Sequence, residues 1–140
     1  MKSSRRRSRE FALQALYAWQ LGGNSFEHLA ADAAEADDFK SADGAFFRRL
    51  LDGVIVEAAA LRELLGPLLD RPWEALSPVE SGILMLATYE LKFVPEVPFR
   101  VVVNEAIELA KDFGGSDGFK YVNGVLDRLA KSLRPGEAAP

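Results

Sequence analysis

Apolar residues recur at helical spacing from the beginning of the chain. Between residues 4 and 21 one side of the expected helix carries Phe11, Ala12, Ala15, Leu16 and Trp19, and a second side carries Leu13, Tyr17 and Leu21. Ser3 or Ser4 is expected to cap this helix, and Gly22-Gly23 to end it. A helix with two apolar sides must be covered from more than one direction, so we expect it to run through the middle of the fold.

The next segments predict a weaker and then a stronger helix. Residues 24–43 are acidic and rich in alanine, which indicates a short helix and a mobile connector. Asp43 is expected to cap a longer helix that includes FFRRLLDGVIVEAAALRELL, and Gly66-Pro67 to end it. Trp73 is expected to anchor the following turn.

The clearest helix start is SPVE at residues 77–80. Ser77 and Glu80 can form a capping box, and Pro78 suits the first helical position. We expect this helix to reach Phe93. Glu90 falls among apolar positions on it, which predicts a cationic partner and a structural role.

Two helices are predicted in the last third of the chain. Val101–Val103 are β-branched and could form a strand, but the apolar arc through Phe113 has helical spacing, with Pro98 before it and Gly114-Gly115 after it. A final helix is expected from near Ser116 and Asp117 to about Leu133. Residues 134–140 are expected to form a disordered tail. The pattern is that of an all-α protein.

The amino-acid composition excludes several classes of protein. A chain of 140 residues with 49% hydrophobic content can form one domain with its own core. The absence of cysteine excludes a disulfide framework, a thiolate zinc site and a cysteine nucleophile. Because no run of about 18 apolar residues occurs, we expect no contact with a membrane and a cytoplasmic location.

The net charge of −4 is unevenly distributed. The first nine residues carry +5, which leaves −9 for the rest of the chain, and the cations are Lys2, Arg5, Arg6, Arg7 and Arg9. A polyanion such as RNA could be held at this end and repelled elsewhere. The alternative is a solvated tail that aids solubility, and charge alone does not separate the two.

The sequence gives little support for catalysis. His28 is the only histidine, so neither a histidine-based triad nor a histidine-ligated metal site can be assembled. No glycine-rich phosphate loop is present, and DFG at residues 112–114 ends a helix without the other kinase motifs. We expect no enzyme activity, no cofactor and no metal.

Four sequence blocks together resemble one known family. They are RRRSREFALQALYAWQ, SPVESGILMLATYEL, VPFRVVVNEAIELAKDFG and GFKYVNGVLDRLAK, and their order and spacing are similar to those of the bacterial transcription antitermination factors of the NusB family. The resemblance spans nearly the whole chain and is weakest between residues 24 and 43. NEAIELAK and KYVNGVLD are its most specific parts.

The resemblance implies an all-α fold of about seven helices in two small packed bundles, forming a single RNA-binding domain over residues 1–133. It implies a non-catalytic protein that binds single-stranded boxA RNA of nascent ribosomal transcripts. It also implies a heterodimer with the small-subunit ribosomal protein NusE, which helps to load an antitermination complex onto RNA polymerase. Whether the free protein forms a homodimer is left open.

The resemblance also implies site residues. Arg6, Arg7 and Arg9 match the family's arginine motif, and Tyr121 matches its aromatic position. Asp117 matches an acidic position, although Gly115, Ser116 and Gly118 replace the neighbouring family residues. Glu80 matches a glutamate directed at NusE.

Each of these residues has a structural alternative. Lys2, Arg5 and Lys120 add positive charge beside the motif residues, but Tyr121 could belong to the core. Asp117 could serve only the helix dipole, and Glu80 only the cap.

Two expectations follow for RNA binding. The arginine end and Tyr121 should form one landing place for unpaired nucleotides. Replacing Arg6, Arg7 and Arg9 together by alanine should leave the fold intact and remove RNA binding. Two alternatives stay open: a protein-interaction adaptor without an RNA role, and an RNA-binding domain related to that of ribosomal RNA methyltransferases.

Overall fold

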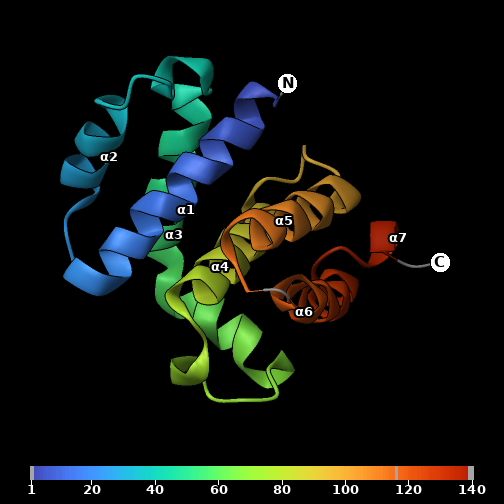
Figure 1. Cartoon of the computed structure of the whole chain (residues 1–140). Coiled ribbons are helices and arrows are strands. Elements are labelled where there is room, and N and C mark those ends of the chain that lie inside the picture. Colours follow the sequence, from blue (N-terminus) through green and yellow to red (C-terminus); the bar gives the residue numbers. More distant parts are fainter. Residues whose placement is uncertain (1, 116, 139–140) are drawn as a thin grey trace. The chain divides into compact units, whose positions relative to one another are not determined.

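All regular secondary structure is helical in the computed structural model, which describes residues 2–115 and 117–138. The chain divides into two compact units, an N-terminal unit (Met1–Val56) and a C-terminal unit (Glu57–Pro140). The long helix α3 (Gly44–Leu65) contributes to both. The all-α class and the division into two helical bundles are as predicted (Figure 1).

The N-terminal unit contains α1 (Ser4–Gly22), α2 (Phe26–Ala34), the 3-10 turn η1 (Phe39–Ser41) and the first half of α3. Ser3 caps α1, and Gly23 ends it with a left-handed φ of 69°. Phe39 packs edge-to-face on Phe11 and Phe47, with ring centroids 5.1 and 5.2 Å apart. This aromatic cluster joins α1, η1 and α3.

One prediction for α1 is wrong over its last two turns. Its second apolar side is covered at Leu13, but Tyr17 is 44% and Leu21 is 63% exposed. The apolar pattern alone does not say where a covering element ends, because a surface helix also carries apolar residues.

Ser8 joins the start of α1 to the start of α3. Its buried hydroxyl lies 2.7 Å from the Asp43 carbonyl oxygen, to which it donates, and accepts from the Asp43 amide at 2.9 Å. Asp43 Oδ1 accepts from the Phe46 amide at 3.0 Å, which confirms the predicted cap of α3.

We expect Ser8→Ala to lower the free energy of unfolding by about 1–3 kcal/mol, because the part-buried Asp43 carbonyl would lose its donor and the Asp43 amide would keep only the Ser4 carbonyl as acceptor. Chemical denaturation measures this change. The exposed Ser132→Ala is the control and should stay within about 0.5 kcal/mol of the wild type. Equal losses in the two variants would contradict the assignment.

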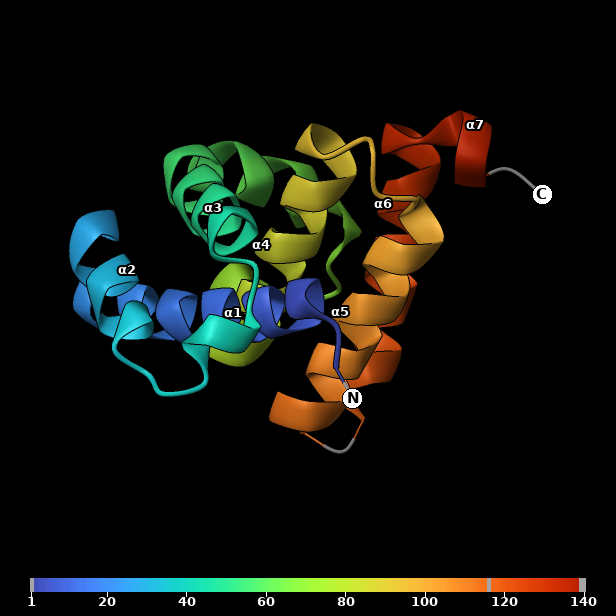
Figure 2. The same ribbon diagram turned by 90° about the horizontal axis from the view of Figure 1, so that it is seen from above.

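The C-terminal unit contains the rest of α3, the 3-10 turns η2 (Gly66–Leu68) and η3 (Trp73–Ala75), and four further helices. These are α4 (Pro78–Phe93), α5 (Phe99–Phe113), α6 (Gly118–Leu133) and α7 (Pro135–Ala138). Helices α4, α5 and α6 pack against one another, as Figures 1 and 2 show. Residues Ser81–Thr88 on α4 are all buried.

Most predicted helix boundaries in this unit are confirmed. The capping box of Ser77 and Glu80 is present, and α5 is a helix that starts after Pro98. A Cβ at Gly114 would lie 2.7 Å from the Ala110 carbonyl oxygen, so the end of α5 requires glycine. The predicted start of α6 at Ser116 lies outside the described residues, and the helix begins at Gly118.

Residues 134–138 of the expected disordered tail include the short helix α7 and several hydrogen bonds. Arg134 is buried and donates to the main-chain carbonyls of Glu90, Leu91, Val94 and Val97 at 2.6–3.1 Å. Glu137 accepts from Arg134 and from the Phe99 amide, and the Phe99 bond is the main reason that the pKa of Glu137 is lowered. Residues 134–137 therefore hold the connection between α4 and α5. The sequence predicts a cationic partner for the Glu90 carboxylate. Arg134 binds the Glu90 main-chain carbonyl, and an ion pair of the carboxylate stays a prediction.

Candidate RNA-binding residues

The five cations of residues 2–9 come together at the start of α1, in a group that we call the basic end (Lys2, Arg5, Arg6, Arg7 and Arg9). The Ser3 side chain accepts from the Arg6 amide at 3.1 Å and fixes the first turn. Cations at a helix N-terminus oppose the helix dipole, so local helix stability does not account for this composition.

Carboxylates from α1 itself and from other elements face the basic end. Arg5 Nε lies 3.8 Å from Asp43, and Arg7 lies 3.7 Å from Asp38 and 3.8 Å from Glu10. Lys2 also pairs with Glu10. Long, partly exposed ion pairs are worth about 0–1 kcal/mol each, so a phosphate could replace the carboxylates of Asp38 and Asp43 at little cost.

Arg9 differs from the other members because it is buried, with 4% exposure. Its guanidinium carbon lies 5.1 Å from the centre of the Phe46 ring, and that of Arg5 lies 4.2 Å from the same ring. Replacing Arg9 by alanine would therefore remove buried packing. A triple replacement of Arg6, Arg7 and Arg9 would therefore also disturb the fold. Arg5, Arg6 and Arg7 are better targets for a variant that tests RNA binding alone.

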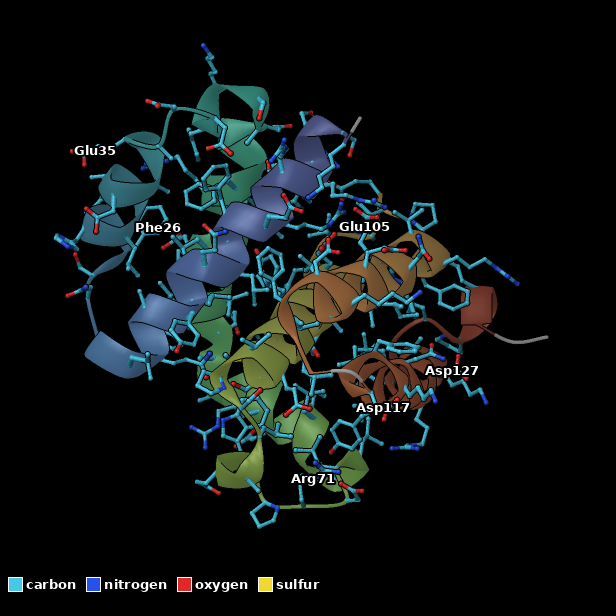
Figure 3. The ribbon with its side chains drawn as sticks, viewed as in Figure 1. Phe26, Glu35, Arg71, Glu105, Asp117 and Asp127 are labelled. Atoms are coloured by element: carbon cyan, nitrogen blue, oxygen red, sulfur yellow. The ribbon has the colours of Figure 1, made fainter. Side chains whose placement is uncertain are left out.

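A second group lies in the C-terminal unit, around Tyr121 near the start of α6. We call it the tyrosine cluster, and it consists of Asp70, Arg71, Glu80 and Tyr121. The Arg71 guanidinium carbon lies 4.3 Å from the Tyr121 ring centre. Arg71 also binds Asp70 through two nitrogens, at 2.7 and 3.4 Å. Figure 3 labels Arg71 on the segment between η2 and η3.

The electrostatics of the tyrosine cluster follow from these contacts. The hydrogen bond from Arg71 lowers the pKa of Asp70, and burial raises the pKa of Tyr121. The pKa of Arg71 is raised, mainly by its bond with Asp70 and to a small extent by the charge of Glu80. The Tyr121 hydroxyl is covered and has no hydrogen-bond partner within the described part of the chain.

Two other predicted residues, Asp117 and Lys120, lie at the start of α6, and Glu80 of the cluster faces this helix end. Asp117 and Lys120 are exposed and lie 3.5 Å apart across the first turn of α6, where Figure 3 labels Asp117. Glu80 uses Oε1 for the capping box, and its Oε2 would lie 3.8 Å from a Cβ at Gly118. Glu80 thus faces the N-terminus of α6, which its charge favours.

Sequence reasoning missed several residues that position these groups. Phe46, Asp38 and Asp43 contact the arginines from other segments, and Asp70 and Arg71 lie in a turn without a recognisable motif. The two groups belong to different units, so a common RNA-binding surface stays a prediction.

Neither a metal site nor a membrane-spanning helix occurs among the described residues. They contain no cluster of three histidine, cysteine or acidic side chains suited to a metal ion. Among the helices of residues 2–115 and 117–138, none combines the length and apolarity needed to cross a bilayer.

A protein-family comparison matches residues 6–131 to the model described as the NusB family. A curated relative from Bordetella pertussis, described as a transcription antitermination protein, is 53% identical, and the alignment covers 99% of this chain and 94% of the relative.

Two solved structures have similar folds. A NusB structure from T. maritima has a TM-score of 0.83 at 34% identity, and the match covers 99% of this chain and 98% of that one. A chain in a crystal structure of the antitermination factors NusB and NusE in complex with double-stranded RNA has a TM-score of 0.83 at 25% identity, with 91% and 96% covered.

Proposed function

Because this chain belongs to the NusB family, we propose that it is a transcription antitermination factor that binds RNA together with NusE. The observation that carries the proposal is the likeness over 91% of the chain to a structure of NusB and NusE with RNA. The role is one of binding and assembly and involves no catalysis.

The basic end supplies the phosphate contacts in this proposal. Arg5, Arg6 and Arg7 are exposed or half-buried, so phosphates can reach them. Arg9 supports the group by packing against Phe46. Phosphate oxygens compete with Asp38 and Asp43 for the guanidinium groups, and a charge-assisted contact to phosphate is stronger than an exposed ion pair.

The finer proposal concerns the RNA and the complex. We propose the boxA element of nascent ribosomal RNA transcripts as the ligand, and loading of the antitermination complex on RNA polymerase as the outcome. The tyrosine cluster, with Asp117 and Lys120 beside it, favours unpaired bases, since aromatic rings and guanidinium planes stack on bases that are not in a helix. The solved complex contains double-stranded RNA, so the form of RNA that is bound must be tested.

Glu80 is the proposed contact for NusE. Its carboxylate is half-buried and one of its oxygens serves the cap of α4. The other oxygen can accept a hydrogen bond from a basic or polar group of the partner.

The experiment is a binding measurement with this chain and with purified NusE, using boxA RNA, a scrambled single strand and a duplex. We expect boxA RNA to bind best, and NusE to tighten binding at least tenfold because the partner extends the RNA-binding surface. Equal affinity for boxA and scrambled RNA would contradict boxA recognition. Binding of NusE without any binding of RNA would favour the adaptor alternative.

A further inference from the structure

We propose that Arg71 is an RNA-binding residue whose guanidinium, which lies over the Tyr121 ring, forms the outer layer of a platform for one unpaired base. This inference rests on the proposed function and extends it to a residue outside every sequence motif described above. It assigns the Arg71 side chain a stacking role in addition to its charge.

The geometry places Arg71 between Tyr121 and the solvent. Tyr121 is half-buried, whereas the Arg71 side chain is 41% exposed with its guanidinium carbon 4.3 Å from the ring centre. On this face of Tyr121 a base meets the guanidinium before it meets the ring. A guanidinium is planar and weakly hydrated, so its open face stacks well on a base.

Asp70 fixes the orientation of this guanidinium. The Asp70 carboxylate accepts hydrogen bonds from Nε at 2.7 Å and from Nη2 at 3.4 Å. These two bonds hold the guanidinium in place over the tyrosine. Within the described residues Nη1 makes no hydrogen bond, so it can donate to a base edge or a phosphate. A plane held before the ligand arrives loses less conformational entropy on binding.

The segment that carries Asp70 and Arg71 is tied down on both sides. Arg128 donates to the Leu68 carbonyl oxygen at 2.7 Å, and the Arg62 guanidinium carbon lies 5.1 Å from the Trp73 ring centre. The Tyr121 hydroxyl is covered beside this stack, where burial raises its pKa and Asp70 also affects it. Together these contacts describe a platform that exists before RNA binds.

The test compares Arg71→Lys with a matched control. Lysine keeps the charge and removes the plane, so we expect boxA RNA to bind on the order of tenfold more weakly, with an unchanged salt dependence. The control is Arg48→Lys, because Arg48 is also exposed and lies over an aromatic ring, that of Phe26, at 4.9 Å, but belongs to neither group of candidate RNA-binding residues. This control should bind RNA as the wild type does. Circular dichroism checks that both variants are folded.

RNA with a single abasic site, scanned along the sequence, identifies the stacked base. At one position the abasic RNA should bind wild type and Arg71→Lys equally well, because the stacking partner is already missing. Wild-type affinity of Arg71→Lys for intact RNA, or a tenfold loss that persists at every abasic position, would overturn the inference and leave the proposed function standing. Failure of the wild type to bind any RNA would overturn both.

Discussion

Replacing Arg5, Arg6 and Arg7 together by glutamine is expected to weaken binding of boxA RNA by on the order of 100-fold at moderate salt. The three side chains supply most of the accessible positive charge of the basic end, with Lys2 as the remainder, and each lost phosphate contact is charge-assisted. Glutamine retains helix propensity and a polar side chain, and Arg9 keeps its packing on Phe46. Fluorescence anisotropy with labelled RNA measures the change.

A second triple variant separates local contacts from net charge. Lys92, Arg100 and Lys131 are exposed in the C-terminal unit, and their replacement by glutamine changes the net charge equally. We expect a loss of less than threefold, because these three residues belong neither to the basic end nor to the tyrosine cluster, and salt screens charges that do not contact the RNA. Similar losses in both variants would mean that overall charge, and not the basic end, holds the RNA.

Replacing Arg134 by alanine is expected to lower the free energy of unfolding by about 3 kcal/mol. The loss is large because one buried guanidinium satisfies four main-chain carbonyls around the end of α4, including those of Glu90 and Leu91. The carbonyls of Glu90 and Val94 also accept from the amides of Val94 and Val97, so the loss of Arg134 falls mainly on the carbonyls of Leu91 and Val97.

Urea denaturation measures this effect, with Lys131→Ala as the control because Lys131 is exposed in the last turn of α6, just before Arg134. The control should lose less than about 0.5 kcal/mol. Arg134→Lys should also be destabilised, since an ammonium group cannot reach all of these carbonyls at once. An Arg134→Ala variant as stable as the control would show that the contacts contribute little.

Local signals explain why much of the fold could be predicted. Ser77 and Glu80 define their helix start within four residues, and Gly23 and Gly114 end helices at positions that disfavour a side chain. Such signals depend on the backbone within one turn. They are therefore readable without knowledge of tertiary contacts.

The end of the chain could not be predicted in the same way. RPGEAAP has the composition of a disordered tail, but Arg134 finds carbonyls that lie 37 to 44 residues earlier in the sequence. The exposure of Tyr17 and Leu21 is a similar case, because an apolar pattern shows which side can be buried and does not show how far the covering element extends.

The site shows the same division between local and tertiary information. The arginine run and Tyr121 are recognisable from the sequence, whereas Asp43, Phe46 and Arg71 act through contacts with distant segments. Nothing near Arg71 in the sequence marks it as a partner of a residue 50 positions later. Only the packing of the turn against α6 brings the two side chains together.

The most direct test of the basic end is the salt dependence of RNA affinity, measured for the wild type and for the Arg5, Arg6 and Arg7 variant. Each neutralised phosphate of a single strand contributes about −0.7 to the slope of log affinity against log salt. We expect the wild-type slope to be steeper than that of the variant by roughly 2. Equal slopes would contradict the claim that these arginines hold the RNA backbone.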